Sequence, residues 1–526
     1  MIHKPTKIIK GAGRALILSI LLFAACTRTP EAPADGLVRS TPEAEGVSSE
    51  GIRAFLIAAA ESTTEFHSFM FLRHGKVIAE GWWDPYGPDL RHTLYSTSKS
   101  FTSTAVGLAV SEGLLTVEDK VVSFFPDQLP DQADPALNEL SVKDLLTMSV
   151  GQDPDPTFLI PPRDSNWVRA FLAIPLVDEP GSRFLYNSMA TYMLSAIVQQ
   201  VTGEKVVDYL KPRLFEPLGI DGMDWEEDPR GINTGGWGLR LKTSDMAKFG
   251  QLYLQKGSWE GAQLLPESWI EEATSAQIQQ APDAPQTTVD SSDWLQGYGY
   301  QFWRCRHQAF RADGAFGQYI IVMPEKDAVV AITAESPDMQ SELNLVWEHL
   351  LPAMKEEPLP ENPDAASSLK ARLAGLALPL PKGLPEPELA GELSGKTYLF
   401  DSNMLGIEEL EFRLSNGILE VNLKQKGTTY PLTFSAGRWT IQETAKPGPN
   451  LLNSALGHFK GLPSSILAGS YAWMNPRSVE LVLRYIESPH YEVYTCIFEE
   501  EEIVVNARSS IGSYQGMPVI RGKLVN

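Results

Sequence analysis

The stretch Tyr95-Ser96-Thr97-Ser98-Lys99-Ser100-Phe101 decides how this chain is interpreted. It leads into residues 102–110, which have the apolar spacing of a helix. Residues three apart lie on the same face of a helix, so Lys99 is expected beside Ser96. A serine hydroxyl becomes a nucleophile when a neighbouring base takes its proton, and a lysine whose pKa is lowered by burial is such a base. The stretch is therefore a candidate catalytic centre.

The tetrapeptide Ser-x-x-Lys is a weak signal by itself. It recurs at Ser367-Ser368-Leu369-Lys370, in a stretch rich in proline and alanine where no pocket is expected. The alternative interpretation of Ser96 is a serine at a helix N-terminus, followed by an ordinary surface lysine. The rest of the chain has to decide between the two interpretations.

The N-terminus has the pattern of a secretory signal. Basic residues in the first 14 positions are followed by an apolar stretch, Ala15–Ala25, which is too short to span a bilayer comfortably. We expect a signal peptide over residues 1–25 and a flexible tether over residues 26–40. The small residues before Cys26 resemble the lipobox of bacterial lipoproteins. That resemblance implies cleavage before Cys26 and lipidation of its thiol.

A lipidated Cys26 would anchor the protein to a membrane of the bacterial cell envelope, on the periplasmic side or at the cell surface. A simple signal peptide with an incidental cysteine is the alternative. The formal net charge of −22 and the lack of a basic stripe argue against nucleic acid as a partner. Besides Cys26 only Cys305 and Cys496 are present, with no CxxC or HExxH motif, so no metal and no cofactor are predicted.

The 526 residues are enough for two or three domains. Residues 66–73 and 76–83 flank His74-Gly75 and predict a β-hairpin. Helical periodicity then dominates until about Leu254, and strands return after Gly297. This order predicts an α/β (α+β) domain over residues 41–355, with an antiparallel sheet flanked by helices and an inserted helical lobe.

Residues 356–390 are rich in proline and predict a linker or an extended strap. Segments with period-2 alternation recur beyond it. Residues 391–526 are therefore expected to form an all-β module, either a sandwich or a barrel.

Two further segments could complete a serine-lysine centre. Tyr186 lies in a turn just before a predicted helix, where its phenol could relay a proton near Lys99. Gly314-Ala315 lies beside the returning strands, and the backbone N–H groups of Ala315 and Ser96 could together hold a developing oxyanion. A half-buried core tyrosine and an ordinary glycine turn are the alternative interpretations.

Together these segments resemble the serine β-lactamase and penicillin-binding-protein superfamily, in its class C-like branch. The likeness is greatest to the group of 6-aminohexanoate-dimer hydrolases and esterases. It covers about residues 46–351 and includes further ordered matches at residues 145–151, 180–181, 214–220, 243–250 and 298–300. The resemblance implies a β-lactamase/transpeptidase-like fold, with Ser96 as nucleophile, Lys99 as base and Tyr186 as its partner. The all-β tail resembles the lipocalin-like module attached to some members.

The chain departs from the family pattern at two motifs. The family's Tyr-x-Asn is here Tyr186-Asn187-Ser188, and its Lys/His-Thr-Gly is here Ala312-Asp313-Gly314. β-Lactamases use the cation of the second motif to hold the substrate carboxylate. We therefore expect poor activity on β-lactams. By resemblance, the expected substrate-binding residues are Ser188, Asp313, Gly314 and Gln318.

The sequence thus predicts a serine hydrolase that cleaves an amide or ester bond of a small molecule through an acyl-enzyme on Ser96. A non-catalytic, lipid-tethered envelope-binding protein is one alternative, and a peptidoglycan D,D-peptidase or β-lactamase is another. The joint presence of Ser96, Lys99 and Tyr186 favours an enzyme, since a pure binding protein has no use for that set. A Ser-His-Asp hydrolase is disfavoured because the chain has no Gly-x-Ser-x-Gly elbow.

Overall fold

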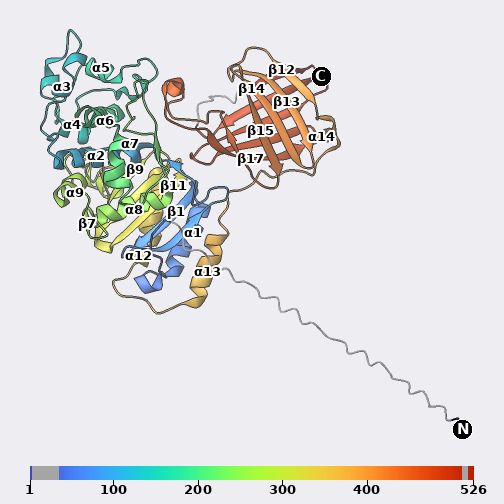
Figure 1. Ribbon diagram of the computed structural model, residues 1–526, viewed down its shortest axis with the longest axis horizontal. Helices are drawn as coiled ribbons and strands as arrows, with labels where there is room; N and C mark the ends of the chain where they lie inside the picture. Colours follow the sequence, from blue (N-terminus) through green and yellow to red (C-terminus); the bar gives the residue numbers. More distant parts are fainter. Residues whose placement is uncertain (3–34, 512–518, 526) are drawn as a thin grey trace.

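A computed structural model describes residues 1–2, 35–511 and 519–525. It shows an N-terminal α/β domain beside a C-terminal β-barrel (Figure 1). The predicted signal peptide, Cys26 and most of the tether lie outside the described residues. Within the described part of the chain, none of the helices has the length and apolar character needed to cross a membrane.

A six-stranded antiparallel sheet forms the centre of the α/β domain, in the order β2-β1-β11-β10-β9-β8. The strands are β1 (Glu65–Arg73), β2 (Lys76–Trp82), β8 (Trp303–Arg304), β9 (Phe310–Gly314), β10 (Gln318–Met323) and β11 (Ala328–Glu335). Met70 of β1 pairs with Ala331 of β11. This pairing confirms that strands from both ends of the domain share one sheet.

Helices cover both faces of this sheet. Along β1, Met70 and Leu72 face the core that includes α8 (Thr243–Leu254), while Phe69 and Phe71 face the core that includes α1 (Ser49–Glu61). Successive residues of a strand point to opposite faces, so a strand covered on both sides is apolar throughout rather than alternating. The closing helical segment consists of α11 (Met339–Leu345), a π-helical turn and α12 (Leu351–Ala353).

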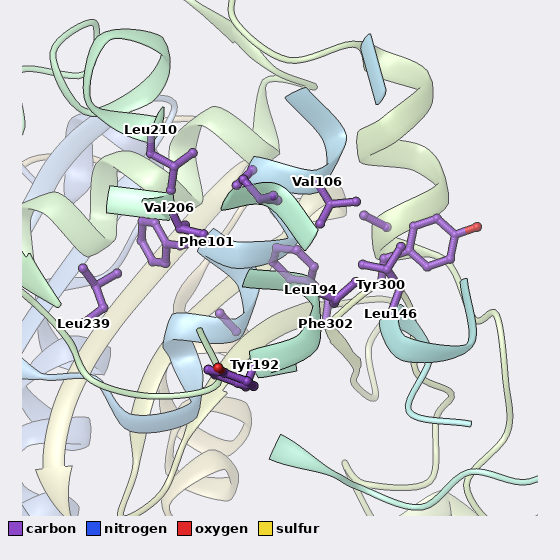
Figure 2. Close-up of a cluster of buried hydrophobic side chains, with 14 of the residues drawn as sticks. Phe101, Val106, Leu146, Tyr192, Leu194, Val206, Leu210, Leu239, Tyr300 and Phe302 are labelled. Carbon is purple, nitrogen blue, oxygen red and sulfur yellow. The ribbon is translucent and has the colours of Figure 1, made fainter. Parts of the chain in front are cut away.

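The helical lobe is inserted between β2 and the returning strands. Its helices are α2 (Ser98–Ser111), α3 (Val121–Phe124), α4 (Val142–Leu146), α5 (Trp167–Leu172), α6 (Ser188–Thr202) and α7 (Val206–Leu210). Helix α2 is buried on all sides from Ser98 to Ala109. Figure 2 shows its Phe101 and Val106 among side chains of the neighbouring elements, such as Leu194 and Leu210. The helix that follows Ser96 is therefore fixed by the core rather than lying on the surface.

Shorter elements complete the α/β domain. A small three-stranded sheet contains β3 (His92–Thr93), which leads directly into the Ser96 turn. The other short elements are β4 (Asp224–Trp225), β5 (Leu239–Leu241), β6 (Ser258–Trp259), β7 (Ala262–Gln263), α9 (Glu267–Thr274) and α10 (Gln286–Ser291).

The proline-rich segment is not the plain linker that its composition predicts. It contains helix α13 (Pro363–Ala374), which packs on α1 and β2. Asn362 caps this helix by accepting from the Ala365 amide at 3.2 Å, and Pro363 at its first position is compatible with a helix. Leu369 and Leu376 join the core beneath the sheet. The high proline content conceals this local helix signal.

The C-terminal module is a barrel, which decides between the two predicted all-β architectures. Nine strands form its ring, in the order β15-β14-β13-β12-β21-β20-β19-β18-β17, and a parallel pairing of Ser435 with Ser470 closes β15 onto β17. Strand β16 also pairs with β17. The bounds are β12 (Lys396–Phe400), β13 (Ile407–Ser415), β14 (Ile418–Gln425), β15 (Thr428–Ala436), β16 (Thr440–Thr444), β17 (Ser465–Asn475), β18 (Ser478–Tyr485), β19 (Tyr491–Phe498), β20 (Glu502–Ser509) and β21 (Val519–Leu524). Helix α14 (Glu388–Glu392) precedes the first strand.

The barrel touches the α/β domain in several places. One is an ion pair between Arg484 of β18 and Glu65 of β1. The long segment between β16 and β17 reaches the helical lobe (Figure 1). There Phe459 packs against Trp167 and Trp237 at centroid distances of 6.2 and 6.3 Å. The turn between β18 and β19 lies against the small sheet that precedes Ser96, where Thr93 donates to the Glu487 carbonyl. The two domains therefore contact each other at more than one place.

Candidate active site

Ser96 and Lys99 lie side by side, as their spacing predicts. Ser96 sits in a 3₁₀ turn, Tyr95–Thr97, immediately before α2, and Lys99 belongs to the first turn of α2. The Nζ atom of Lys99 donates to the Oγ atom of Ser96 at 2.9 Å. Ser96 remains partly exposed whereas Lys99 is 1% exposed. The pair thus presents a hydroxyl to solvent with an amine behind it.

Three oxygen atoms surround the Lys99 amine. Besides Ser96, it donates to Ser188 Oγ at 3.0 Å and to the Gly236 carbonyl at 2.6 Å. Burial lowers the pKa of Lys99 to about 7, and the more distant Asp155 and Asp313 only partly oppose that shift. A large share of Lys99 is therefore neutral near neutral pH, which is the state a general base needs.

The contact between Lys99 and Gly236 depends on a glycine. A Cβ atom at position 236 would lie 2.7 Å from the Ser188 carbonyl oxygen. The neighbouring Gly235 has a φ of +65°, and a Cβ there would lie 2.7 Å from the Cβ of Ser195. The loop can therefore approach α6 only because it lacks side chains here. In the sequence, the pair Gly235-Gly236 indicates a place where the backbone can approach another segment. Nothing in the sequence connects this pair with Lys99.

Tyr186 ends the loop before α6, as predicted. The amine of Lys99 lies 4.9 Å from the centroid of its ring. The ring of Trp303 stacks on that of Tyr186 at 5.7 Å, with an interplanar angle of 27°. Burial raises the pKa of the Tyr186 phenol, and a hydrogen bond with Ser96 opposes that rise. Tyr186 is therefore a neutral phenol that holds a transferable proton close to Ser96.

The turn between β9 and β10 is docked against the Ser96 turn. A Cβ atom on Gly314 would lie 2.1 Å from the Leu94 carbonyl oxygen, so only glycine permits this approach. Thr97 Oγ1 donates to the Gln318 carbonyl at 2.7 Å, and this second contact also joins the two turns. The segments of Ser96 and Ala315, which the sequence placed in one candidate oxyanion hole, are thereby brought together.

The residues expected to bind substrate differ in their surroundings. Gln318 has no exposed surface, and its amide donates to the carbonyls of Ala315 and Ala334 at 3.1 and 2.7 Å. Its side chain therefore stabilises the turn between β9 and β10 and is not open to a substrate. Asp313 is 9% exposed and accepts from Arg311 Nε at 2.7 Å. Ser188 is 8% exposed and is engaged by Lys99.

Asp155 and Thr157 also belong to this site, although no sequence motif marked them. Thr157 Oγ1 accepts from the Ser188 amide at 3.1 Å, and it donates to Asp155 Oδ1 at 2.6 Å. Asp155 is partly exposed, and burial raises the pKa of its carboxyl. This loop places an acidic group near the Lys99 amine.

Comparison with known proteins identifies the family. The sequence model described as Beta-lactamase matches residues 66–351. This chain belongs to the beta-lactamase family. The match covers the six-stranded sheet and the helical lobe, and it contains every site residue described above. The barrel lies outside it.

Relatives of this family member include several hydrolases. The 6-aminohexanoate-dimer hydrolase of Paenarthrobacter ureafaciens is 26% identical over 292 residues, which is 52% of this chain and 73% of that protein. The D-aminopeptidase of Brucella anthropi is 28% identical over 162 residues, which is 28% of this chain and 30% of that protein. The beta-lactamase-family chain is accordingly a serine hydrolase of the group that includes amidases, esterases and carboxypeptidases.

Solved structures with a similar fold include two penicillin-binding-protein homologues. The one from Caulobacter crescentus is 17% identical, covers 60% of this chain and 99% of its own, and has a TM-score of 0.47. The octameric one from Pyrococcus abyssi is also 17% identical, covers 90% of this chain and 99% of its own, and has a TM-score of 0.46.

Ala312, the residue that stands in this sequence where the family resemblance implies a Lys/His cation, is 1% exposed. The nearby Arg311 is fully buried and engaged with Asp313. Among the described residues, no group of His, Cys, Asp and Glu side chains has the arrangement of a metal site. Cys305 and Cys496 are both buried free thiols in different domains.

Proposed function

We propose that this chain hydrolyses an amide or ester bond through an acyl-enzyme on Ser96. The observation that carries the proposal is the Lys99 amine, buried and 2.9 Å from the Ser96 hydroxyl, with its pKa lowered to about 7. An ordinary surface lysine would be protonated at neutral pH and could not accept a proton. The burial of Lys99 removes that obstacle.

The proposed reaction has two halves. Lys99 takes the Ser96 proton as Oγ attacks the carbonyl carbon, and the backbone N–H groups of Ser96 and Ala315 stabilise the oxyanion. Tyr186 gives its proton to the leaving amine or alcohol, the bond to that group breaks, and Lys99 restores the proton to Tyr186. Water then attacks the acyl carbonyl with the same groups acting in reverse order, which releases the acid and regenerates Ser96.

We propose a linear amide or ester substrate rather than a β-lactam. Two carboxylates, Asp155 and Asp313, lie close enough to Lys99 to affect its pKa, while Ala312 supplies no cation for a substrate carboxylate. A β-lactam carboxylate would find no cation at position 312, and the nearby Arg311 is already paired with Asp313. The likeness to a 6-aminohexanoate-dimer hydrolase and a D-aminopeptidase supports a linear amide. Turnover of p-nitrophenyl esters, D-amino-acid amides and linear amide dimers, compared with that of nitrocefin, tests this proposal.

Covalent labelling tests the role of Ser96. A fluorophosphonate probe should label the wild-type chain at Ser96, and Ser96→Ala should abolish the labelling. The control is Ser367→Ala, which changes the second Ser-x-x-Lys sequence on the exposed surface of α13. Labelling that survives Ser96→Ala contradicts the proposed nucleophile. An unlabelled wild-type chain that hydrolyses none of the substrates would favour the binding-protein alternative.

We also propose that Cys26 carries a lipid anchor and that the enzyme works at the bacterial cell envelope, on the periplasmic side or at the cell surface. The support is the lipobox-like sequence before Cys26. Mass spectrometry of the mature N-terminus should find a diacylglyceryl-modified cysteine, and Cys26→Ser should move the protein from the membrane to the soluble fraction. An unmodified Cys26 contradicts the anchor.

The lipocalin-like character of the barrel is a proposal about its fold alone. In support, its strands close into a ring. Its interior is lined by apolar side chains and holds a cavity of only about 20 Å³. This volume is smaller than the pockets of roughly 300–1,000 Å³ that bind small molecules. We therefore propose no ligand for this interior cavity.

A further inference from the structure

The barrel contacts the segment before Ser96 through one hairpin turn, between β18 and β19. Glu487 in this turn accepts from Arg91 Nε and Nη2 at 3.0 and 2.9 Å. Its carbonyl accepts from the Thr93 amide at 2.9 Å and from Thr93 Oγ1 at 3.1 Å. Tyr95, two residues after Thr93, faces the same turn.

Tyr95 bonds to the last residue of the same turn. Its hydroxyl lies 2.5 Å from Nε2 of His490, and Nδ1 of His490 lies 2.7 Å from Oε1 of Glu335. A carboxylate only accepts hydrogen bonds, so Nδ1 carries the proton and Nε2 accepts from Tyr95. Burial lowers the pKa of His490, which favours this neutral form. His490 is therefore fixed in one orientation between β11 and Tyr95.

His490 also packs against the other candidate oxyanion segment. The ring of Phe316 meets it edge to face, at 4.9 Å and 87°, and lies 5.5 Å from the ring of Tyr95. Tyr95 directly precedes Ser96, and Phe316 directly follows Ala315. One side chain from the barrel thus contacts both residues that adjoin the two proposed oxyanion donors.

Both of these residues hold a backbone conformation that side chains disfavour. The φ of Tyr95 is +47° and that of Phe316 is +66°. Bulky residues rarely occupy the left-handed region, and they remain there only where the surrounding structure enforces it. The bond to His490 and the packing of the three rings supply that restraint on both sides of the site.

We propose that His490 is a positioning residue, supplied by the barrel, that aligns the backbone amides of Ser96 and Ala315. This inference rests on the proposed acyl transfer at Ser96. His490 takes no part in proton transfer. It holds Tyr95 and Phe316 so that the two amides point to one place, which completes the active site of the α/β domain with a residue from the barrel.

The alternative is that the hairpin turn only holds the two domains together. A second tyrosine that bonds to the same turn provides a matched control for that alternative. The hydroxyl of Tyr86 donates to the Ser488 carbonyl at 3.0 Å. Tyr86→Phe and Tyr95→Phe therefore each remove one tyrosine hydroxyl that joins the α/β domain to the same turn. Only Tyr95 adjoins Ser96. His490→Ala and His490→Gln change the other side of the bond, and the glutamine can keep an acceptor for Tyr95 while losing the Nδ1 contact.

The experiment compares these full-length variants by kcat and KM on a p-nitrophenyl ester, by the rate of fluorophosphonate labelling and by Tm. We expect Tyr95→Phe and His490→Ala to lower kcat and the labelling rate by about 10- to 100-fold, with KM changed less than about twofold, since misplacement of a reacting group costs on this scale. His490→Gln should recover part of kcat. Tyr86→Phe should keep the wild-type kcat even if its Tm falls as far.

Two results would overturn the inference while Ser96 is still labelled in the wild type. One is a wild-type kcat in both Tyr95→Phe and His490→Ala. The other is an equal loss of kcat in Tyr86→Phe and Tyr95→Phe, which would show that the turn only fastens the domains together. A wild-type chain that is not labelled at Ser96 would instead overturn the proposed function, and this inference with it.

Discussion

The carbonyl oxygen of Gly236 accepts a hydrogen bond from the Lys99 amine at 2.6 Å, the shortest of the three contacts around that amine. A backbone carbonyl can accept from a neutral amine as well as from an ammonium, and it carries no charge that would hold the proton strongly. This contact orients Lys99 toward Ser96 without the ion pair that would raise its pKa. Gly236 therefore matters for the basicity of Lys99 as well as for its position.

Activity should follow the ionisation of Lys99. Because the free base is the active form, kcat/KM for an ester should fall about tenfold per pH unit below a pKa of about 7 and level off above it. A pH profile of kcat/KM between pH 5 and 9 measures this directly. A profile that still rises tenfold per unit at pH 9, as an ordinary lysine with a pKa of 10.5 would give, would contradict the assignment of Lys99 as the base.

Lys99→Arg should lower kcat by about 10²- to 10⁴-fold, because a guanidinium stays protonated and cannot accept the serine proton. The matched control is Lys248→Arg, since Lys248 is 2% exposed and also donates to a carbonyl, that of Gly219, at 2.8 Å. Steady-state kinetics should show a normal pH profile in the control. Equal losses of kcat in the two variants would argue that only packing is affected.

Gly236→Ala should lower kcat by about 10- to 100-fold, because the new methyl group meets the Ser188 carbonyl and shifts the loop from Lys99. The control is Gly391→Ala, where a Cβ atom has no neighbour within 4 Å. The kcat of both variants and the midpoint of the pH profile are to be measured. An unchanged kcat and midpoint in Gly236→Ala would show that the carbonyl does not orient Lys99.

Gln318→Ala should release the turn that carries Ala315. The variant leaves buried carbonyls without their donors, so we expect a loss of about 1–3 kcal/mol in the free energy of unfolding and a fall in kcat. Gln425→Ala removes a comparable amide-to-carbonyl bond, to Leu405, in the barrel. Urea unfolding should show a lower free energy of unfolding in both variants. Steady-state kinetics should show a lower kcat only in Gln318→Ala.

Leu369→Ala tests whether α13 is part of the α/β domain. Leu369 is 3% exposed in the core beneath the sheet, so its truncation should cost about 2–5 kcal/mol in the free energy of unfolding. The neighbouring exposed Lys370, changed to alanine, should have little effect. A Leu369→Ala variant with the wild-type unfolding midpoint would show that α13 is only a linker.

The parts that could be predicted from the sequence depend on local spacing. The distance of three residues placed Lys99 beside Ser96, and the strand-like sequence after Gly297 predicted the returning strands of the sheet, such as β10 (Gln318–Met323). Strand β17 was not predicted, because Gly469 interrupts its pattern where the Thr433 carbonyl of β15 approaches. The carbonyl of Gly236 and the side chain of His490 were missed because they reach the site through contacts between distant segments, which no spacing rule encodes.

The bond between Tyr95 and His490 joins residues 395 positions apart. A growing chain emerges N-terminus first, so the α/β domain can begin to fold before the hairpin turn of the barrel has been made. If His490 aligns the oxyanion hole, the nucleophile exists long before it can work at full rate. Synthesis of this hydrolase would then pass through a stage of much lower activity, and the full rate would be reached only when the barrel closes and docks.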